Sequence, residues 1–183
     1  MFRDKILIAT DLSPASLPAI DKGATLARQL GAAVHLLYIY DPTLLSPMFL
    51  LPGGATLLPA QDHIDAFEAA IETHLRQLQS ERLPGISRVE RHIRQDPSAS
   101  NGICAAARQL SAELLVLGTH GRTGIAQAFL GSVAEQVVRH APCPVLTIRS
   151  IRTWSPFKRT VVSSSGRFLG RLVRRFMGTP IAP

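Results

Sequence analysis

Short apolar runs alternate with longer amphipathic segments along most of the chain, and this alternation leaves few folds open to it. The apolar runs have the length of strands buried in a sheet, whereas the longer segments repeat their apolar residues at helical spacing. The strands are predicted at 5–10, 34–40, 87–94, 114–117 and 145–148, the third being the least buried. The helices are predicted at 14–30, 61–82, 96–110 and 132–140.

This order of elements predicts an α/β fold, with one open five-stranded parallel sheet and helices on both faces. In such sheets a ligand binds beyond the carboxyl ends of the strands, at the point where the strand order reverses. Segment 42–60 breaks the pattern, because it combines prolines and glycines with many leucines. We expect it to form a long apolar loop without an element of its own.

A glycine-rich stretch from Gly118 to Ser132 follows the most continuous apolar run and ends at a predicted helix. Glycine has no Cβ and adopts positive φ readily, so the backbone N–H groups of such a loop can turn toward a ligand. The free N–H groups after Gly131 favour phosphate, and the Ser132 hydroxyl can add a hydrogen bond. The stretch is neither a P-loop, which ends in Gly-Lys-Ser/Thr, nor a GxGxxG dinucleotide motif.

The residues of this stretch and those after it resemble the universal stress protein family. The resemblance is carried by Gly118-x2-Gly121-x9-Gly131-Ser132, then Val133-Ala134-Glu135 and Ala141-Pro142-Cys143-Pro144-Val145-Leu146. Ile8-Ala9-Thr10-Asp11 with Ser13 is similar to the first strand and turn of that family. The similarity covers residues 1–149, which we interpret as one Rossmann-like nucleotide-binding domain followed by a separate tail at 150–183.

The resemblance implies that the protein binds an adenine nucleotide, ATP, with or without magnesium. The residues that would contact its phosphates and ribose are Gly118, Gly121, Gly131, Ser132 and Val133. Asp11 would lie near the nucleotide and any magnesium ion, Ile39 would offer its backbone to the adenine, and Leu117 would line the pocket. Arg122 either meets a phosphate or is solvated.

The resemblance further implies a homodimer formed partly through the last strand, Val145–Ile148. Two residues depart from the family pattern: Leu12 and Gln95 stand where the family usually has glycine. We expect Leu12 to crowd the first turn. Neither departure touches the glycines of the phosphate loop, so nucleotide binding stays the prediction.

The net charge of +7 comes from the tail alone. The first 148 residues hold 12 of the 20 basic side chains and all 13 acidic ones, so the body is nearly neutral and is not expected to bind nucleic acid. From Arg149 onward the chain holds eight basic residues and no acid, with apolar residues at helical spacing between Phe168 and Met177. An amphipathic helix there would suit an anionic membrane or a protein partner, whereas the alternative is a disordered or self-docked tail.

The sequence points to a cytoplasmic binding protein rather than an enzyme. The apolar run after Met1 is too short for a signal peptide, and two cysteines without metal spacing fit a reducing compartment. Since His120 has no nearby nucleophile or carboxylate in sequence, we favour a loop-ordering role for it over a catalytic one. We expect at most slow ATP hydrolysis or autophosphorylation. The leading hypothesis is a nucleotide-dependent conformational or dimer switch in stress response. The alternative is a nucleotide-free interaction module recruited through its basic tail.

Overall fold

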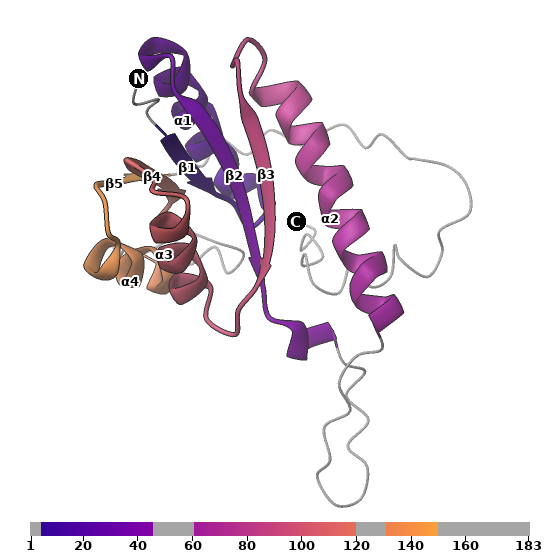
Figure 1. Cartoon of the computed structure of the whole chain (residues 1–183). Coiled ribbons are helices and arrows are strands. Elements are labelled where there is room, and N and C mark those ends of the chain that lie inside the picture. The colour runs from indigo at the N-terminus through magenta and orange to yellow at the C-terminus, as the bar shows by residue number, and fades with distance from the viewer. Residues whose placement is uncertain (1–4, 46–60, 120–130, 150–183) are drawn as a thin grey trace, which may run out of the picture.

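A computed structural model describes residues 5–45, 61–119 and 131–149 of the chain, with strands and helices in alternation (Figure 1). The elements run in the order β1 (Lys5–Ala9), η1 (Pro14–Ser16), α1 (Leu17–Leu30), β2 (Ala33–Tyr40), η2 (Pro42–Leu45), α2 (Gln61–Arg82), β3 (Val89–Gln95), α3 (Ala99–Gln109), β4 (Leu114–Gly118), α4 (Ser132–His140) and β5 (Val145–Ile148). Here η marks a short 3-10 helix.

The five strands form one parallel sheet in the order β3-β2-β1-β4-β5. The chain therefore builds outward from β1 in one direction, returns, and continues on the other side with β4. This reversal between β1 and β4 creates the place where a doubly wound sheet binds its ligand. The predicted five-stranded parallel α/β fold is confirmed.

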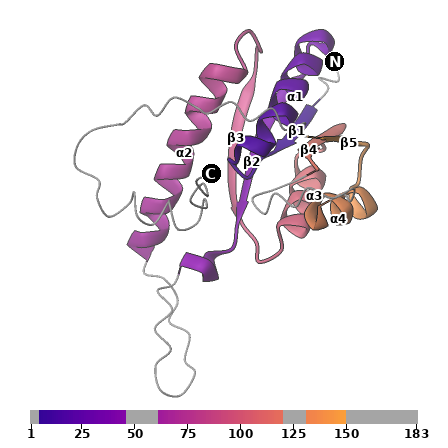
Figure 2. The same ribbon diagram turned by 180° about the vertical axis from the view of Figure 1, so that it is seen from behind.

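Alternation along the strands divides the apolar residues between two cores, one on each face of the sheet. Ile6, Ile8 and Val116 face the core covered by α1 and α2. Leu7 and Leu115 face the core covered by α3 and α4. The two views from opposite sides show the same arrangement, with α2 beside β3 and the pair α3 and α4 together across the sheet (Figures 1 and 2).

Two glycines determine how α1 sits on the sheet. A Cβ on Gly23 would lie 2.5 Å from Cδ1 of Ile8, so only glycine allows the helix this close to β1. Gly31 follows the last residue of α1 with a φ of 65°, the left-handed conformation that ends many helices. The helix end predicted at Gly31 is confirmed.

Several element boundaries differ from the predictions. β1 ends at Ala9, β2 begins at Ala33, β4 ends at Gly118, and α3 covers Ala99–Gln109 rather than 96–110. The first helix was predicted to begin near Pro14, but Pro14–Ser16 form η1, and α1 begins at Leu17. The prediction that segment 42–60 has no element is wrong for Pro42–Leu45, which form η2. The third strand begins at Val89, later than predicted. Residues 46–60 lie outside the described residues.

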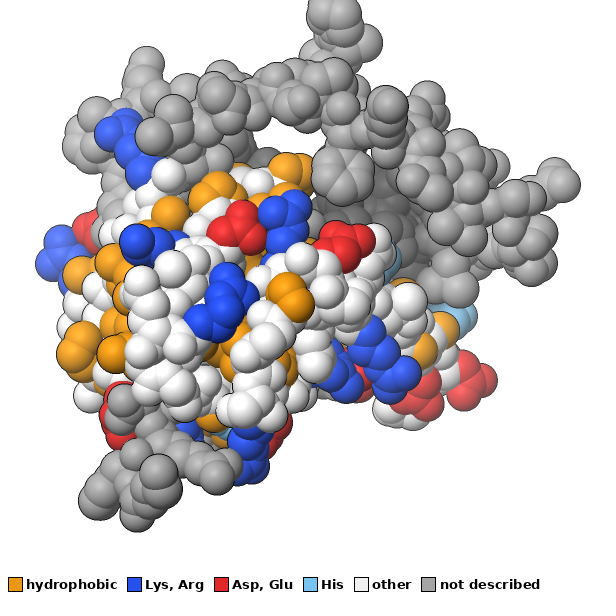
Figure 3. All heavy atoms as spheres, turned by 90° about the horizontal axis from the view of Figure 1, so that it is seen from above, with side chains coloured by type: hydrophobic (Ala, Val, Ile, Leu, Met, Phe, Trp, Pro, Cys, Tyr) orange, Lys and Arg blue, Asp and Glu red, His pale blue; other side chains and the backbone are white. Residues whose placement is uncertain are grey.

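Figure 3 shows the end of the molecule where β3 begins, with charged side chains of both signs interspersed among apolar ones on its described part. This mixture agrees with the near-neutral charge of the body. No helix in the described ranges is both long enough and apolar enough to cross a membrane. Cys104 and Cys143 are free thiols that pack in the α3 and α4 core, and burial raises the pKa of both.

Candidate functional site

A cavity of about 310 Å³ opens at the carboxyl ends of β1, β2 and β4, on both sides of the strand-order reversal. Its volume lies at the lower end of the range of about 300–1,000 Å³ that small-molecule sites occupy. The described residues that line it are Ala9, Thr10, Asp11, Ser16, Leu37, Ile39, Ala99, Ile103, Leu117, Gly118, Thr119, Gly131, Ser132, Val133 and Ala134.

The lining separates into an apolar part and a polar part. Leu37, Ile103 and Leu117 belong to the buried core between the sheet and α3, so one wall of the cavity is a continuation of that core. Polar groups come from the turn after β1 and from the start of α4. A flat apolar ligand with a polar or charged end would match such a lining.

Asp11 lines the cavity, and one of its two carboxylate oxygens has no partner among the described residues. Its Oδ1 accepts hydrogen bonds from the backbone N–H of Ser13 at 3.0 Å and from the Ser13 hydroxyl at 2.6 Å. Its Oδ2 is buried and has no hydrogen-bond partner among the described residues. A buried carboxylate oxygen without a partner is costly, so this atom calls for a ligand group that donates to it or coordinates to it.

Hydroxyl groups hold the turn that carries Asp11. The Thr10 hydroxyl accepts from the backbone N–H of Leu12 at 3.0 Å and lies 2.8 Å from the Ser16 hydroxyl. Leu12 itself has a φ of 62°, which a residue with a Cβ rarely adopts. The crowding predicted at Leu12 therefore takes the form of a left-handed backbone, and this conformation explains why glycine suits the position.

The start of α4 presents backbone N–H groups to the cavity. Gly131 is the N-cap and has no side chain to satisfy them, and the first turn of the helix is Ser132, Val133 and Ala134, all of which line the cavity. The positive end of the helix dipole reinforces these donors and favours an anion there.

Of the two reasons given for the glycines of this loop, positive φ is wrong at the two that are described, Gly118 and Gly131. Gly131 has a φ of −58°, which any residue adopts, and among the described glycines only Gly31 and Gly85 have positive φ, so Gly118 does not. Backbone freedom therefore does not account for Gly118 or Gly131. What remains is the missing Cβ, which leaves the backbone open where the cavity meets it.

A further glycine positions the cavity wall made by Ile39. A Cβ on Gly102 of α3 would lie 2.9 Å from Cβ of Asp96 and 3.1 Å from Cδ1 of Ile39. The helix can approach the end of β2 only because this position has no side chain. Gly102 thus determines how far α3 stands from the cavity.

Seven of the predicted site residues line this one cavity: Asp11, Ile39, Leu117, Gly118, Gly131, Ser132 and Val133. Gly121 and Arg122, like His120, lie outside the described residues. Sequence reasoning missed eight further lining residues, namely Ala9, Thr10, Ser16, Leu37, Ala99, Ile103, Thr119 and Ala134. Thr10 and Thr119 directly follow β1 and β4, so their places at the carboxyl ends of strands were the signal that could have found them.

The fold and the cavity define a doubly wound α/β protein with a cavity at the switch point of its sheet. The model of the universal stress protein family matches residues 2–149, and the chain belongs to this family. A universal stress protein of Methanocaldococcus jannaschii is 31% identical over 153 residues, which cover 79% of this chain and 81% of that protein.

Solved structures show the same fold. The universal stress protein UspA of Lactobacillus plantarum superposes with a TM-score of 0.64 and 27% identity, covering 81% of this chain and all of that one. A universal stress protein solved in complex with cAMP superposes with a TM-score of 0.58 and 23% identity, covering 81% of this chain and 98% of that one.

Proposed function

We propose that this universal stress protein binds an adenine nucleotide, ATP, in the cavity at the carboxyl ends of β1, β2 and β4. The observation that carries the proposal is the lining itself: apolar walls for a base, the Asp11 carboxylate and the uncapped start of α4 surround one space. Among the described residues, Oδ2 of Asp11 has no partner. The similar protein solved with cAMP supports an adenine nucleotide as the ligand.

In this proposal, different residues bind the adenine and the phosphates of the nucleotide. Ile39 and Leu117 lie at the ends of β2 and β4, where the adenine would be held. The N–H groups of Ser132 and Val133, with the Ser132 hydroxyl, would hold phosphate oxygens. Gly118, Gly121 and Gly131 would let the phosphates approach the backbone, and Arg122 either meets a phosphate or is solvated.

Asp11 suits either a ribose hydroxyl or a magnesium ion. Magnesium is usually held in proteins by one or two carboxylates together with substrate phosphates, and the unpaired Oδ2 supplies one such oxygen. The ion would neutralise phosphate charge that otherwise repels the carboxylate. Measuring the nucleotide affinity with and without magnesium distinguishes the two roles, because only a magnesium ligand makes the affinity depend on the ion.

We further propose that nucleotide binding acts on a homodimer formed through β5 (Val145–Ile148). β5 is an edge strand of the described sheet, and Val138 on the adjacent α4 is 48% exposed. Hydrogen bonds connect this edge to the cavity, because Gly131 N–H donates to Thr119 O at 2.7 Å and Thr119 N–H donates to Ile148 O at 2.9 Å. A nucleotide that fixes the start of α4 would therefore act on the end of β5, as a dimer switch requires.

The aspartate provides the sharpest test, because the chain contains a matched control. Asp41 makes the same turn as Asp11, accepting from the N–H of Thr43 at 2.9 Å and from its hydroxyl at 2.7 Å, but does not line the cavity. We expect Asp11→Asn to weaken ATP binding in magnesium by roughly 10- to 100-fold by calorimetry, the value of a charged hydrogen bond. Asp41→Asn should leave the affinity unchanged. Equal effects of the two substitutions would overturn the site.

The tail and the compartment remain proposals. Residues 150–183 lie outside the described residues, so the predicted amphipathic helix stays a prediction. Two free thiols fit a cytoplasmic protein. Flotation of the protein with anionic vesicles, with and without residues 151–183, tests the membrane role of the tail; flotation that does not depend on the tail would exclude it.

A further inference from the structure

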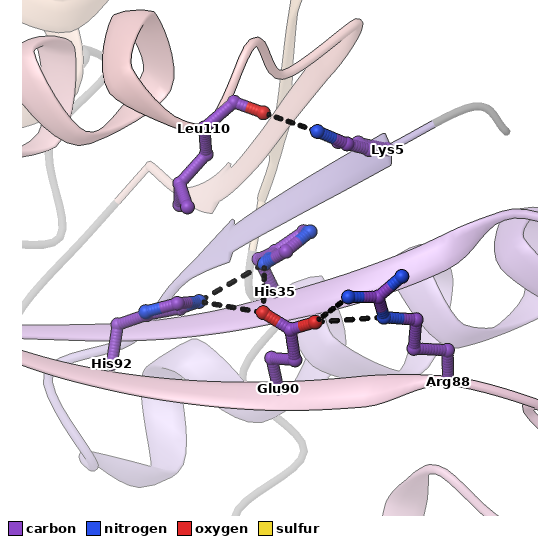
Figure 4. Close-up of polar contacts among 6 residues, drawn as sticks. All are labelled: Lys5, His35, Arg88, Glu90, His92 and Leu110. Carbon is purple, nitrogen blue, oxygen red and sulfur yellow. Dashed lines mark hydrogen bonds and ion pairs between the residues drawn. The ribbon is translucent and has the colours of Figure 1, made fainter. Parts of the chain in front are cut away.

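Three polar side chains form a cluster on the sheet face that α3 covers, apart from the residues that line the cavity. His35 lies on β2, and Glu90 and His92 lie on the neighbouring strand β3. His35 is paired in register with Glu90, and Leu37, two residues further along β2, is paired with His92. The period of two along each strand therefore places all three side chains on one face, where they point toward a common centre (Figure 4).

The three donor atoms of this cluster lie close together. Nδ1 of His35 is 2.9 Å from Nε2 of His92 and 3.5 Å from Oε2 of Glu90, while Nε2 of His92 is 3.9 Å from the same oxygen. The other carboxylate oxygen, Oε1, accepts from Nε of Arg88 at 2.7 Å. Arg88 thus orients Glu90 so that its second oxygen faces the two imidazoles (Figure 4).

We propose that His35, Glu90 and His92 form a binding site for a divalent transition-metal ion of the zinc type. With bonds of about 2.0–2.2 Å, two ligand atoms of a tetrahedral zinc ion lie roughly 3.3–3.5 Å apart. The three distances in the cluster fall on both sides of this value, so movements of about 0.5 Å would place all three atoms on one ion.

The donor set and its surroundings suit zinc with an open position. Two histidines and one glutamate leave the fourth position of a tetrahedral ion to water, and the cluster lies at the sheet edge, with the Glu90 side chain 36% exposed. Arg88 acts as an outer partner that fixes the carboxylate ligand, as the partners of bound metals commonly do.

The protonation of the two histidines and the charges around them determine how tightly the cluster should bind zinc. Burial lowers the pKa of both His35 and His92, and a histidine binds a metal ion through its neutral imidazole. Three cations oppose the ion: Arg88, paired with Glu90; Lys5, whose amine donates to Leu110 O at 3.0 Å; and Arg94, whose charge acts on His92. We therefore expect micromolar binding rather than the far tighter binding of structural zinc sites.

The competing explanation is a purely structural pair, in which one imidazole donates to the other and Glu90 balances their polarity. That arrangement needs no ion and predicts no specific zinc binding. The two explanations therefore differ in one measurable quantity, the zinc affinity of the folded chain.

The test is calorimetry of zinc chloride with the untagged full chain, freed of metal by a chelator and without nucleotide. We expect one zinc ion per chain with a dissociation constant on the order of 1–10 μM. His92→Gln and Glu90→Gln should each weaken binding at least about tenfold. His63→Gln, which removes an exposed histidine of α2, is the matched control and should change nothing.

Cobalt provides a second readout, because Co²⁺ in a four-coordinate site absorbs strongly in the visible range. That band should appear in the wild type and in His63→Gln, and it should be absent from Glu90→Gln. Circular dichroism reports whether each variant is folded, and Glu90→Gln decides the matter if His92→Gln fails to fold. The proposal is overturned if zinc does not bind to the wild type, or if His92→Gln and Glu90→Gln bind it as tightly as His63→Gln.

Discussion

At position 12, glycine should stabilise the protein more than alanine does, which reverses the usual order of the two residues. Leu12 has a φ of 62°, and this left-handed conformation costs a residue with a Cβ roughly 1–2 kcal/mol. Glycine avoids that cost but loses about 0.4–1 kcal/mol more through the greater freedom of its unfolded chain. The difference predicts that Leu12→Gly is more stable than Leu12→Ala by roughly 0.5–1 kcal/mol.

Comparing these two variants removes the effect of packing, because both lose the Leu12 side chain, which packs partly against the core. Lys22, an exposed residue within α1, provides the control pair. Lys22→Ala should be more stable than Lys22→Gly by about 1 kcal/mol, since the backbone at this position is helical. Urea denaturation with linear extrapolation measures all four free energies of unfolding. If Leu12→Ala is as stable as Leu12→Gly or more stable, Leu12 does not have the left-handed conformation described beside the cavity.

Two further predictions concern the packing of α3 and the contact between α2 and β3. Gly102→Ala should destabilise the protein by roughly 1–2 kcal/mol in thermal or urea unfolding, because the new methyl group meets Ile39. The same contact should weaken nucleotide binding. An unchanged ATP affinity would mean that Ile39 is not part of the nucleotide site. Burial raises the pKa of Glu72, but hydrogen bonds from Arg76 and Arg91 outweigh it and lower the pKa overall. A lowered carboxyl pKa stabilises the fold above the unfolded value of about 4.5 and loses that effect as the pH falls through the folded value. Glu72→Gln should therefore cost up to about 1 kcal/mol at pH 7 and nothing in strong acid, as unfolding at the two pH values would measure.

Sequence patterns predicted the helices and strands where the pattern was long or bounded by a strong signal. The helix at Gln61–Arg82 has the predicted bounds because its apolar residues repeat over 22 residues, and α1 ends where Gly31 predicts. Starts were harder to predict. A proline at position 14 suits the first turn of a 3-10 helix as well as that of an α-helix, and only tertiary packing decides between them.

Seven of the fifteen described lining residues could be predicted, because the resemblance placed residues at the ends of β1, β2 and β4 and at the start of α4. The geometry that gives them their chemistry could not be predicted. No sequence pattern shows that Oδ2 of Asp11 has no partner in the described part of the chain, or that Gly131 has an ordinary φ. The cluster of His35, Glu90 and His92 was missed because His35 is more than 50 residues from the other two in sequence and meets them only through the β2–β3 register.

The measurement that tests the nucleotide site most directly is ATP calorimetry on Gly131→Val. With a φ of −58° and a ψ of 149°, the backbone at Gly131 accepts valine, so the fold should persist while the side chain blocks the approach of phosphate. Ala141→Val is the matched control, because Ala141 lies at the other end of α4 with nearly the same backbone angles, −63° and 142°, and does not line the cavity. We expect the wild type and Ala141→Val to bind ATP alike and Gly131→Val to bind it at least about tenfold more weakly. Equal ATP affinity in all three proteins would contradict a phosphate site at the start of α4.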